Sequence, residues 1–322
     1  MKSILRTFLA VLLAALLSPV TAQEQYPNKP IKFVVPYPAG GVSDNSSRAI
    51  ADRLGRELGQ TMIIENKAGA ASTLSSNYVS RSAPDGYTLY AAPVSIVINP
   101  VLQAKVEYDA QRDFAPISMM ITSAFVLQAN LDLKVKDLKE LLALIRANPD
   151  KFAIGTSGMG SINHLAAEYF IKNFGLKMAV IHYKGGAPAA TDLIGGRIHM
   201  MFSATNEALP LVSSGRTQGI AVSTAKRISS LPDLPTIDEA SGTKGFDAVF
   251  WLALLAPAKT PAPVLKRLEA AMQVVGADQT LRDDLAKKGV DLYVSTPAEV
   301  QSFMQRDGSK WGEIIRQLGI KE

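Results

Sequence analysis

The sequence lacks cysteine altogether. Its 322 residues therefore hold no disulfide, the usual covalent support of an exported domain, and no cysteine that could carry a lipid anchor. The roughly 300 residues behind an expected leader are still enough to bury a hydrophobic core without such support. A length of this order also favours two domains.

The sequence has little net charge of either sign. It holds 34 Lys and Arg against 29 Asp and Glu, which leaves a formal charge of +5 at pH 7. So small and evenly spread a surplus argues against nucleic acid or a membrane surface as a partner. Long apolar runs are missing as well: beyond residue 22 the longest candidate, residues 248–256, has the length of a buried strand.

The N-terminus has the three parts of a secretory signal peptide. Lys2 and Arg6 are basic, residues 8–17 are apolar, and the small residues Val20 and Ala22 form a cleavage pattern. The apolar run is well short of the ~20 residues that a transmembrane helix needs. We therefore expect cleavage after Ala22, with residues 1–22 removed and the mature chain released into the periplasm.

Motifs for nucleotide binding and catalysis are also missing. No glycine-rich loop ends in the Lys-Ser/Thr pair of a P-loop, and the glycines at 155, 158 and 160 have the wrong spacing for a dinucleotide fingerprint. Residues 155–159 depart from the nucleophile elbow at their last position, Met159. The three histidines show no metal-ligand spacing. We expect no metal, no cofactor and no catalysis, with a small exported hydrolase as the alternative.

What the sequence does contain is a regular alternation of strand and helix patterns. Apolar runs typical of strands cover residues 31–35, 61–65, 87–92, 152–155, 178–183 and 198–203. Helical patterns cover residues 43–58, 74–82, 138–148, 161–174, 187–194, 265–275, 279–287 and 297–318. In the first of these, Ile50, Leu54 and Leu58 share one face, and Gly59 ends it. Such alternation favours an α/β fold with mainly parallel sheets.

Three of the joints between strand and helix are rich in glycine. They lie at residues 36–44, 155–161 and 184–188. Glycine lets backbone N–H groups approach a ligand closely, and the helix N-terminus that follows favours negative charge. Ligands of open α/β sheets bind at the carboxyl ends of the strands. Loops from two domains would then face each other across a ligand cleft, although each loop alone could be an ordinary turn.

From residue 26 onward the chain resembles the solute-binding proteins of tripartite tricarboxylate transporters, the Bug/TctC-like family. The motifs that carry the resemblance lie at residues 26–31, 34–41 with Asp44, 58–60, 65–70, 83–89, 160–161 with 164–166, 183–185, 192–196, 231–236, 256–258 with 260–261, and 310–311. They cover essentially the whole mature chain in the family's order. No single motif is specific, but the set is.

The resemblance implies a type II periplasmic-binding-protein fold, in which two α/β domains are joined by two crossover segments with a ligand cleft between them. We expect a discontinuous first domain of residues 23–123 and 248–322 and a second domain of residues 124–247. Residues 114–128 are long and apolar enough for one crossover, and the return falls within residues 236–256. The implied function is capture of a small carboxylate (a dicarboxylate, tricarboxylate, amino acid or aromatic acid) by a monomer. Its partners would be integral-membrane transporter subunits, or alternatively the periplasmic domain of a sensor kinase.

The resemblance also implies a set of ligand-binding residues in the loops of both domains. They are Pro36, Tyr37, Pro38, Ala39, Gly40, Gly41, Ser43, Asp44, Ala71, Ser72, Ser95, Ser157, Gly158, Ser161, His164, Lys184, Gly185, Ser203, Thr205 and Asn206. The chain departs from the family in having Val42, and Ala71 with Ser72, where glycine is common. Both departures add bulk at the cleft and favour a smaller ligand.

Overall fold

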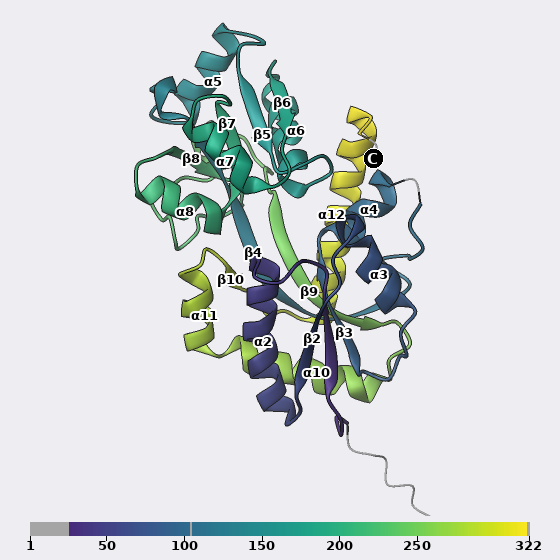
Figure 1. Ribbon diagram of the computed structural model, residues 1–322. Coiled ribbons are helices and arrows are strands. Elements are labelled where there is room, and N and C mark those ends of the chain that lie inside the picture. The colour runs from purple at the N-terminus through teal and green to yellow at the C-terminus, as the bar shows by residue number, and fades with distance from the viewer. Residues whose placement is uncertain (1–25, 104, 321–322) are drawn as a thin grey trace, which may run out of the picture.

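A computed structural model describes residues 26–103 and 105–320. The expected signal peptide, residues 1–22, lies outside the described residues. The described chain forms two lobes, joined by strands that run from one lobe into the other (Figure 1). Among these residues no helix combines the length and the hydropathy that a membrane crossing requires.

The first lobe is built around three parallel strands in the order β2-β1-β3. Its elements are β1 (Ile31–Val35), α2 (Val42–Leu58), β2 (Met62–Asn66), η1 (Ala70–Ser72), α3 (Thr73–Ser80), β3 (Thr88–Pro93), α4 (Ser95–Leu102), α10 (Ala262–Gly276), α11 (Gln279–Ala286), β10 (Asp291–Leu292) and α12 (Pro297–Leu318). The apolar stripe expected on α2 is confirmed: Ile50, Leu54 and Leu58 are buried, and Gly59 ends the helix at φ 69°.

The second lobe repeats the scheme around parallel strands in the order β7-β5-β6. Its elements are η2 (Leu131–Leu133), α5 (Leu138–Ala147), β5 (Ala153–Thr156), α6 (Ile162–Phe174), β6 (Ala179–His182), α7 (Gly186–Ile194), β7 (Met200–Ala204), α8 (Thr205–Ser213), β8 (Gln218–Val222) and α9 (Ile237–Ser241). In both lobes the helices follow the carboxyl ends of the strands, so the loops between them gather at one edge of each sheet.

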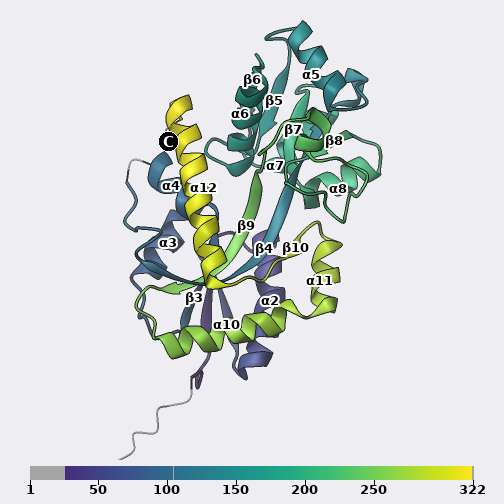
Figure 2. The ribbon, with the colours of Figure 1, turned by 180° about the vertical axis from the view of Figure 1, so that it is seen from behind.

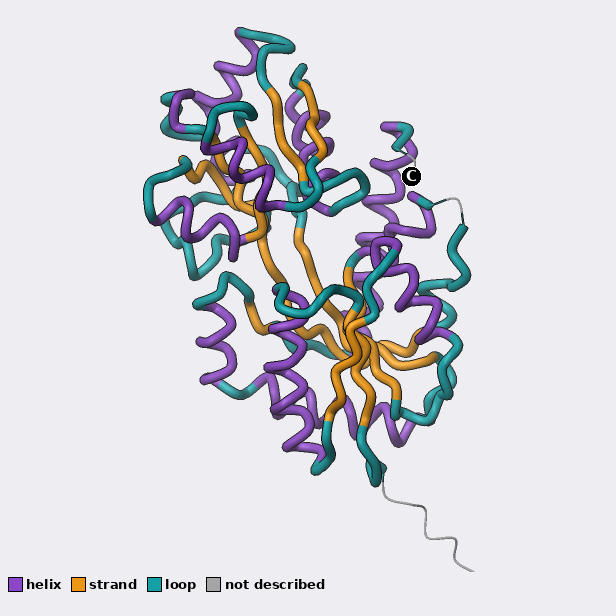
Figure 3. Tube along the Cα trace, in the orientation of Figure 1, coloured by secondary structure: helices purple, strands orange, loops and turns teal. Residues whose placement is uncertain are grey.

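Two long strands connect the lobes, β4 (Phe114–Ala129) and β9 (Val249–Pro257) (Figure 3). The first part of β4 pairs with β9, and its last five residues pair with β7 of the second lobe. Both long strands run antiparallel to their partners, so the expectation of mainly parallel sheets is wrong. Among the described strands four pairings are parallel and five antiparallel. The antiparallel pairings arise because each crossover strand passes through the middle of the sheet.

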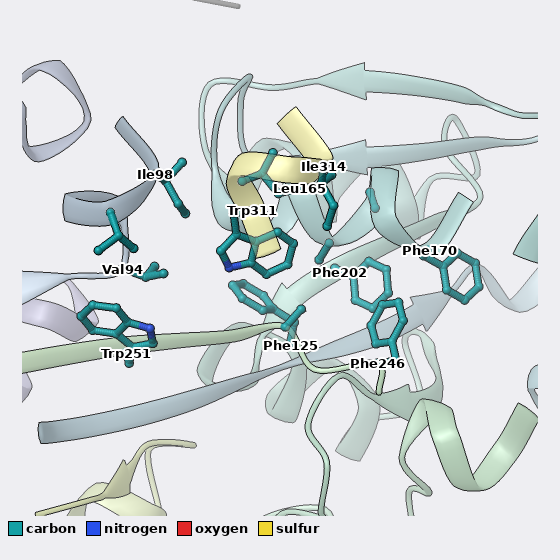
Figure 4. Close-up of a cluster of buried hydrophobic side chains, with 14 of the residues drawn as sticks. Val94, Ile98, Phe125, Leu165, Phe170, Phe202, Phe246, Trp251, Trp311 and Ile314 are labelled. Carbon is teal, nitrogen blue, oxygen red and sulfur yellow. The ribbon is translucent and has the colours of Figure 1, made fainter. Parts of the chain in front are cut away.

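One hydrophobic cluster extends through both lobes and is completed by α12, which rises along the first lobe to the second (Figure 2). Trp251 of β9 and Trp311 of α12 are both fully buried in it, together with Phe202 and Leu165 of the second lobe (Figure 4). The Trp251 indole N–H donates to the carboxylate of Asp307 at 2.7 Å. This shared core sets the positions of the loops at the cleft.

Candidate ligand-binding site

A cavity of about 710 Å³ lies between the two lobes. The loop after β1 contributes Gly40 and Gly41, and the start of α8 contributes Asn206 and Glu207. Lys288, which follows α11, also lines the cavity. A glycine-rich loop of the first lobe and a helix start of the second lobe thus share one space.

The carboxylate of Asp44 holds the first glycine-rich loop in shape. Its Oδ2 accepts from the Gly40 N–H at 2.9 Å and from Arg48 Nε at 2.9 Å. Asn66 Nδ2 donates both to Asp44 Oδ1 at 2.8 Å and to the Tyr37 carbonyl at 2.9 Å. Burial alone would raise the pKa of Asp44, but the hydrogen bonds from Arg48, Gly40 and Asn66 outweigh it and lower this pKa to about 2. Asp44 therefore faces its own loop and acts as the latch of that loop.

The N-terminus of α2 is left open toward the cavity. Its N-cap is Gly41, and no side chain caps the first turn. The unpaired N–H groups at a helix start favour an anion, because they are donors that carry partial positive charge. Gly40 has φ 88°, and a Cβ at this position would meet no protein atom within 4 Å. The backbone here is open to a ligand carboxylate.

The loop after β2 is strained. Ala70, Ala71 and Ser72 have φ values of 46°, 48° and 79°, a left-handed conformation that side chains disfavour. Two contacts to α4 and its start maintain it: Ser72 Oγ lies 2.6 Å from Ser95 Oγ, and Asn99 Nδ2 donates to the Ala71 carbonyl at 2.8 Å. The departures from glycine at 71 and 72 thus occur where the backbone conformation suits glycine best, which is typical of a functional site.

An amide, not a carboxylate, organises the loop after β5. Asn163 Oδ1 accepts from Ser157 Oγ at 2.8 Å and from Ser161 Oγ at 2.6 Å. Its Nδ2 donates to the Phe202 carbonyl at 3.1 Å. Ser161 is also the N-cap of α6, since its Oγ accepts from the His164 N–H at 3.3 Å. Sequence reasoning missed Asn163, although its position two residues after a capping serine is a signal that could have found it.

Two histidines that are distant in sequence meet beside this loop. The rings of His164 and His182 are 4.5 Å apart between centroids, edge to face. His164 Nδ1 accepts from the Gly160 N–H at 3.0 Å, and His182 Nδ1 lies 2.8 Å from Thr156 Oγ1. Desolvation and the neighbouring His164 lower the pKa of His182. The buried ring of His164 thus supports the loop after β5 through its hydrogen bond to Gly160.

Of the three predicted ligand-binding residues near the start of α8, two are buried in the wall of the lobe and one lines the cavity. Ser203 is fully buried and accepts from Gln128 Nε2 at 2.5 Å, and buried Thr205 donates to the Ala124 carbonyl at 2.9 Å. These two hydroxyls belong to the wall of the lobe. Asn206 lines the cavity, and its buried Oδ1 has no hydrogen-bond partner among the described atoms.

The other predicted residues lie on the loops as follows. Pro36 and Ser43 are buried, and Tyr37 is half-buried beside Phe250 with 6.4 Å between ring centroids. Pro38, Ala39 and Lys184 are exposed, whereas Gly158 and Gly185 are half-buried. Their contact with a ligand stays a prediction. Among the described residues, no three His, Asp or Glu side chains gather as a metal site would require.

Comparison with known proteins identifies the family of the chain. Residues 46–320 match the profile of the tripartite tricarboxylate transporter family receptor, TctC. A protein of Agrobacterium vitis, the "UPF0065 protein in the TAR-I ttuE-ttuC' intergenic region", is 32% identical over 97% of this chain and 91% of its own length.

Two solved structures extend the similarity to the fold. The periplasmic binding protein BugD is 32% identical with a TM-score of 0.76, covering 92% of this chain and all (100%) of that one. Rpa4515 of R. palustris, solved with adipate, is 29% identical with a TM-score of 0.79, covering 91% of this chain and 98% of its own. The chain belongs to the TctC family of tripartite tricarboxylate transporter receptors and has the fold of its periplasmic solute-binding proteins.

Proposed function

We propose that this receptor binds a small carboxylate in the cleft between its lobes and delivers it, in the periplasm, to the membrane subunits of a tripartite transporter. One observation carries the proposal: the uncapped N-terminus of α2, with Gly40 and Gly41, opens into a cavity shared by both lobes. A related protein of the same fold holds adipate, a dicarboxylate. Donors of this kind neutralise a carboxylate without a dedicated arginine.

The energetics fit a binder that uses backbone groups. A hydrogen bond to a charged group contributes about 1.5–3 kcal/mol, so three or four give roughly 5–12 kcal/mol before ordering costs. Micromolar affinity needs about 8 kcal/mol. The residues that line the cavity offer amides, hydroxyls and Asn206, and no histidine stands among them, so we expect the ligand to leave chemically unchanged.

We further propose that the lobes are two domains, residues 23–123 with 248–322 and residues 124–247, and that the mature monomer begins at Gln23. β4 passes between them near Ala124, whose register partner on β9 is Val249. These two neighbouring positions are suited to act as the hinge of closure around a ligand. A periplasmic sensor domain stays the alternative partner.

A thermal-shift panel of mono-, di- and tricarboxylates tests the binding function. A carboxylate that binds only the folded protein adds about 2.7 kcal/mol to the free energy of unfolding at a hundredfold excess over Kd, and it thereby raises the melting temperature. The amide of each active acid is the matched control, since it keeps the shape and loses the charge. Mass spectrometry should recover the bound acid unaltered. A panel without any shift would contradict carboxylate binding, and a converted product would favour the hydrolase alternative.

A further inference from the structure

The strongest unexplained group at the cleft is the carboxylate of Glu207. It lies in the first turn of α8 and lines the interlobe cavity together with Gly40 and Gly41. A Cβ built on Gly186 would lie 2.3 Å from Glu207 Oε2 and 2.7 Å from Oε1. Glycine at 186 therefore makes room for this side chain. The third glycine-rich loop, one of the three candidate loops for a ligand carboxylate, already has a carboxylate of the protein beside it.

The charge of Glu207 is not compensated by a neighbouring side chain. Within residues 26–103 and 105–320 it forms no ion pair and accepts no hydrogen bond. The Glu207 side chain is itself exposed to the cleft, and the desolvation that it does experience raises the pKa of its carboxyl group. Two cations line the same cavity, Lys287 and Lys288; both are exposed, and Lys287 is paired with Asp284 at 3.3 Å. This end of the cleft thus holds an unpaired negative charge.

An unpaired carboxylate that lines a ligand cleft discriminates between ligands by their charge. A second ligand carboxylate placed beside it would be repelled, because a bound ligand displaces the water that screens the two like charges. An ammonium group in the same place would gain a charge-assisted hydrogen bond and would supply the missing partner. The uncapped N-terminus of α2, which belongs to the first lobe and borders the same cavity, favours the opposite sign.

We propose that Glu207 is the specificity-determining residue of this cleft and selects a carboxylate that also carries a cationic nitrogen, in preference to a dicarboxylate. The inference rests on the proposed carboxylate-binding function and narrows its substrate class to amino-acid-like zwitterions. The carboxylate of the ligand lies toward the first lobe at Gly40 and α2. Its ammonium group lies toward the second lobe at Glu207.

A purely structural role for Glu207 makes a different prediction. An acidic side chain in the first turn of α8, near the start of α7, is stabilised by the partial positive charge of a helix N-terminus. Its removal would then lower the melting temperature and leave the order of ligand affinities unchanged. The test must therefore read selectivity and not stability alone.

Calorimetry with two matched series of probes separates these roles. One series is the linear dicarboxylates from succinate to adipate, and the other is the ω-amino acids with the same number of methylene groups, from 3-aminopropanoate to 5-aminopentanoate. We expect the wild type to bind the best ω-amino acid about tenfold or more tightly than its matched dicarboxylate. Glu207→Gln should abolish or reverse that ratio. Glu140→Gln, which removes a first-turn carboxylate from α5, should keep it.

A second variant guards against misfolding of the first. Gly186→Ala adds a Cβ that must displace the flexible end of Glu207, and it should also reduce the preference for the ω-amino acid. The inference is overturned if the wild type prefers dicarboxylates, if both variants keep the wild-type ratio, or if neither series binds at any length. A shift in the thermal panel of carboxylates under any of these results would leave the proposed binding function standing. A blank panel would remove both.

Discussion

The two lobes shape their glycine-rich loops with different chemistry. In the first lobe an ionised side chain, Asp44, latches the loop after β1 through Gly40, Arg48 and Asn66. In the second lobe a neutral amide, Asn163, does the same for the loop after β5. The Asp44 carboxylate accepts hydrogen bonds from backbone and side-chain N–H groups, and the Asn163 amide bonds to two hydroxyls and a backbone carbonyl. Only the first of these arrangements depends on a charge. The lobes should therefore respond differently to acid.

The helix starts at these loops differ in the same sense. Ser161 caps α6 with its own hydroxyl, whereas α2 begins at Gly41 without a side-chain cap. The second lobe thus uses one of its predicted ligand groups for its own helix, and the first lobe leaves its donors to a ligand. We infer that the ligand carboxylate depends mainly on the first lobe. Each of the following predictions tests that asymmetry.

The largest effect on binding is expected from Gly40→Val. At φ 88° a valine is strained, and its side chain enters space that no protein atom occupies within 4 Å. Gly59 is a matched control. It lies at the other end of α2, at φ 69°, and a Cβ there would also meet no protein atom within 4 Å. Both variants should lose about 1–3 kcal/mol of stability. Only Gly40→Val should lose detectable carboxylate binding in calorimetry.

Equal binding by the two valine variants would contradict the dependence of the ligand carboxylate on the first lobe, because the loop after β1 would then not approach the ligand. A loss of binding in both would point to strain carried through α2. Secretion and circular dichroism of each variant establish that it folds.

The intermediate effect concerns acid and Asp44. Its pKa of about 2 in the folded state lies below the ordinary value of 3.8, so its contribution to stability is present above pH 3.8 and is lost as the pH falls toward 2. The contribution is about 2 kcal/mol. Urea unfolding should show that the wild type loses about this much more stability than Asp44→Asn between pH 5 and pH 2.

Asn163→Ala is the counterpart in the second lobe. It removes the acceptor of the Ser157 and Ser161 hydroxyls and the donor to the Phe202 carbonyl, which should cost about 1–3 kcal/mol at every pH. Its loss relative to the wild type should therefore not change between pH 5 and pH 2. A pH-independent difference for Asp44→Asn would show that the first latch does not depend on its charge.

Local patterns in the sequence predicted most of the elements, and the failures have physical causes. The face formed by Ile50, Leu54 and Leu58 is a local property of 3.6-residue periodicity, and so α2 was predictable. Helices α4 and α8 escaped prediction because Pro100 and Pro210 lie inside them, where proline normally argues against a helix. Their burial against the sheet outweighs that preference.

The candidate site was predictable as a set of loops but not as a set of contacts. Asp44 and Ser161 hold their own loops through bonds to residues within four positions, a distance at which sequence patterns are informative. His164 meets His182 because the adjacent strands β5 and β6 end at one edge of the sheet. Glu207 meets Gly186 because β7 and β6, on either side of β5, end at that edge as well. Such pairs are set by strand order, which no local pattern of residues encodes.

The smallest effect is expected from Lys184→Ala. Lys184 is the cation within the glycine-rich loops of the second lobe, so it is where a charge-paired carboxylate site would have to form. It is exposed, and in the described chain it forms no ion pair. A single exposed charge contributes about 0–1 kcal/mol, so we expect less than about a fivefold change in affinity and no change in melting temperature.

Lys151→Ala removes the same charge before β5, at the opposite end of that strand from the cleft, and controls for the long-range field. Should Lys184→Ala cripple binding while Lys151→Ala and Gly40→Val do not, the carboxylate would be held by charge in the second lobe. The open helix start of α2 would then have another role.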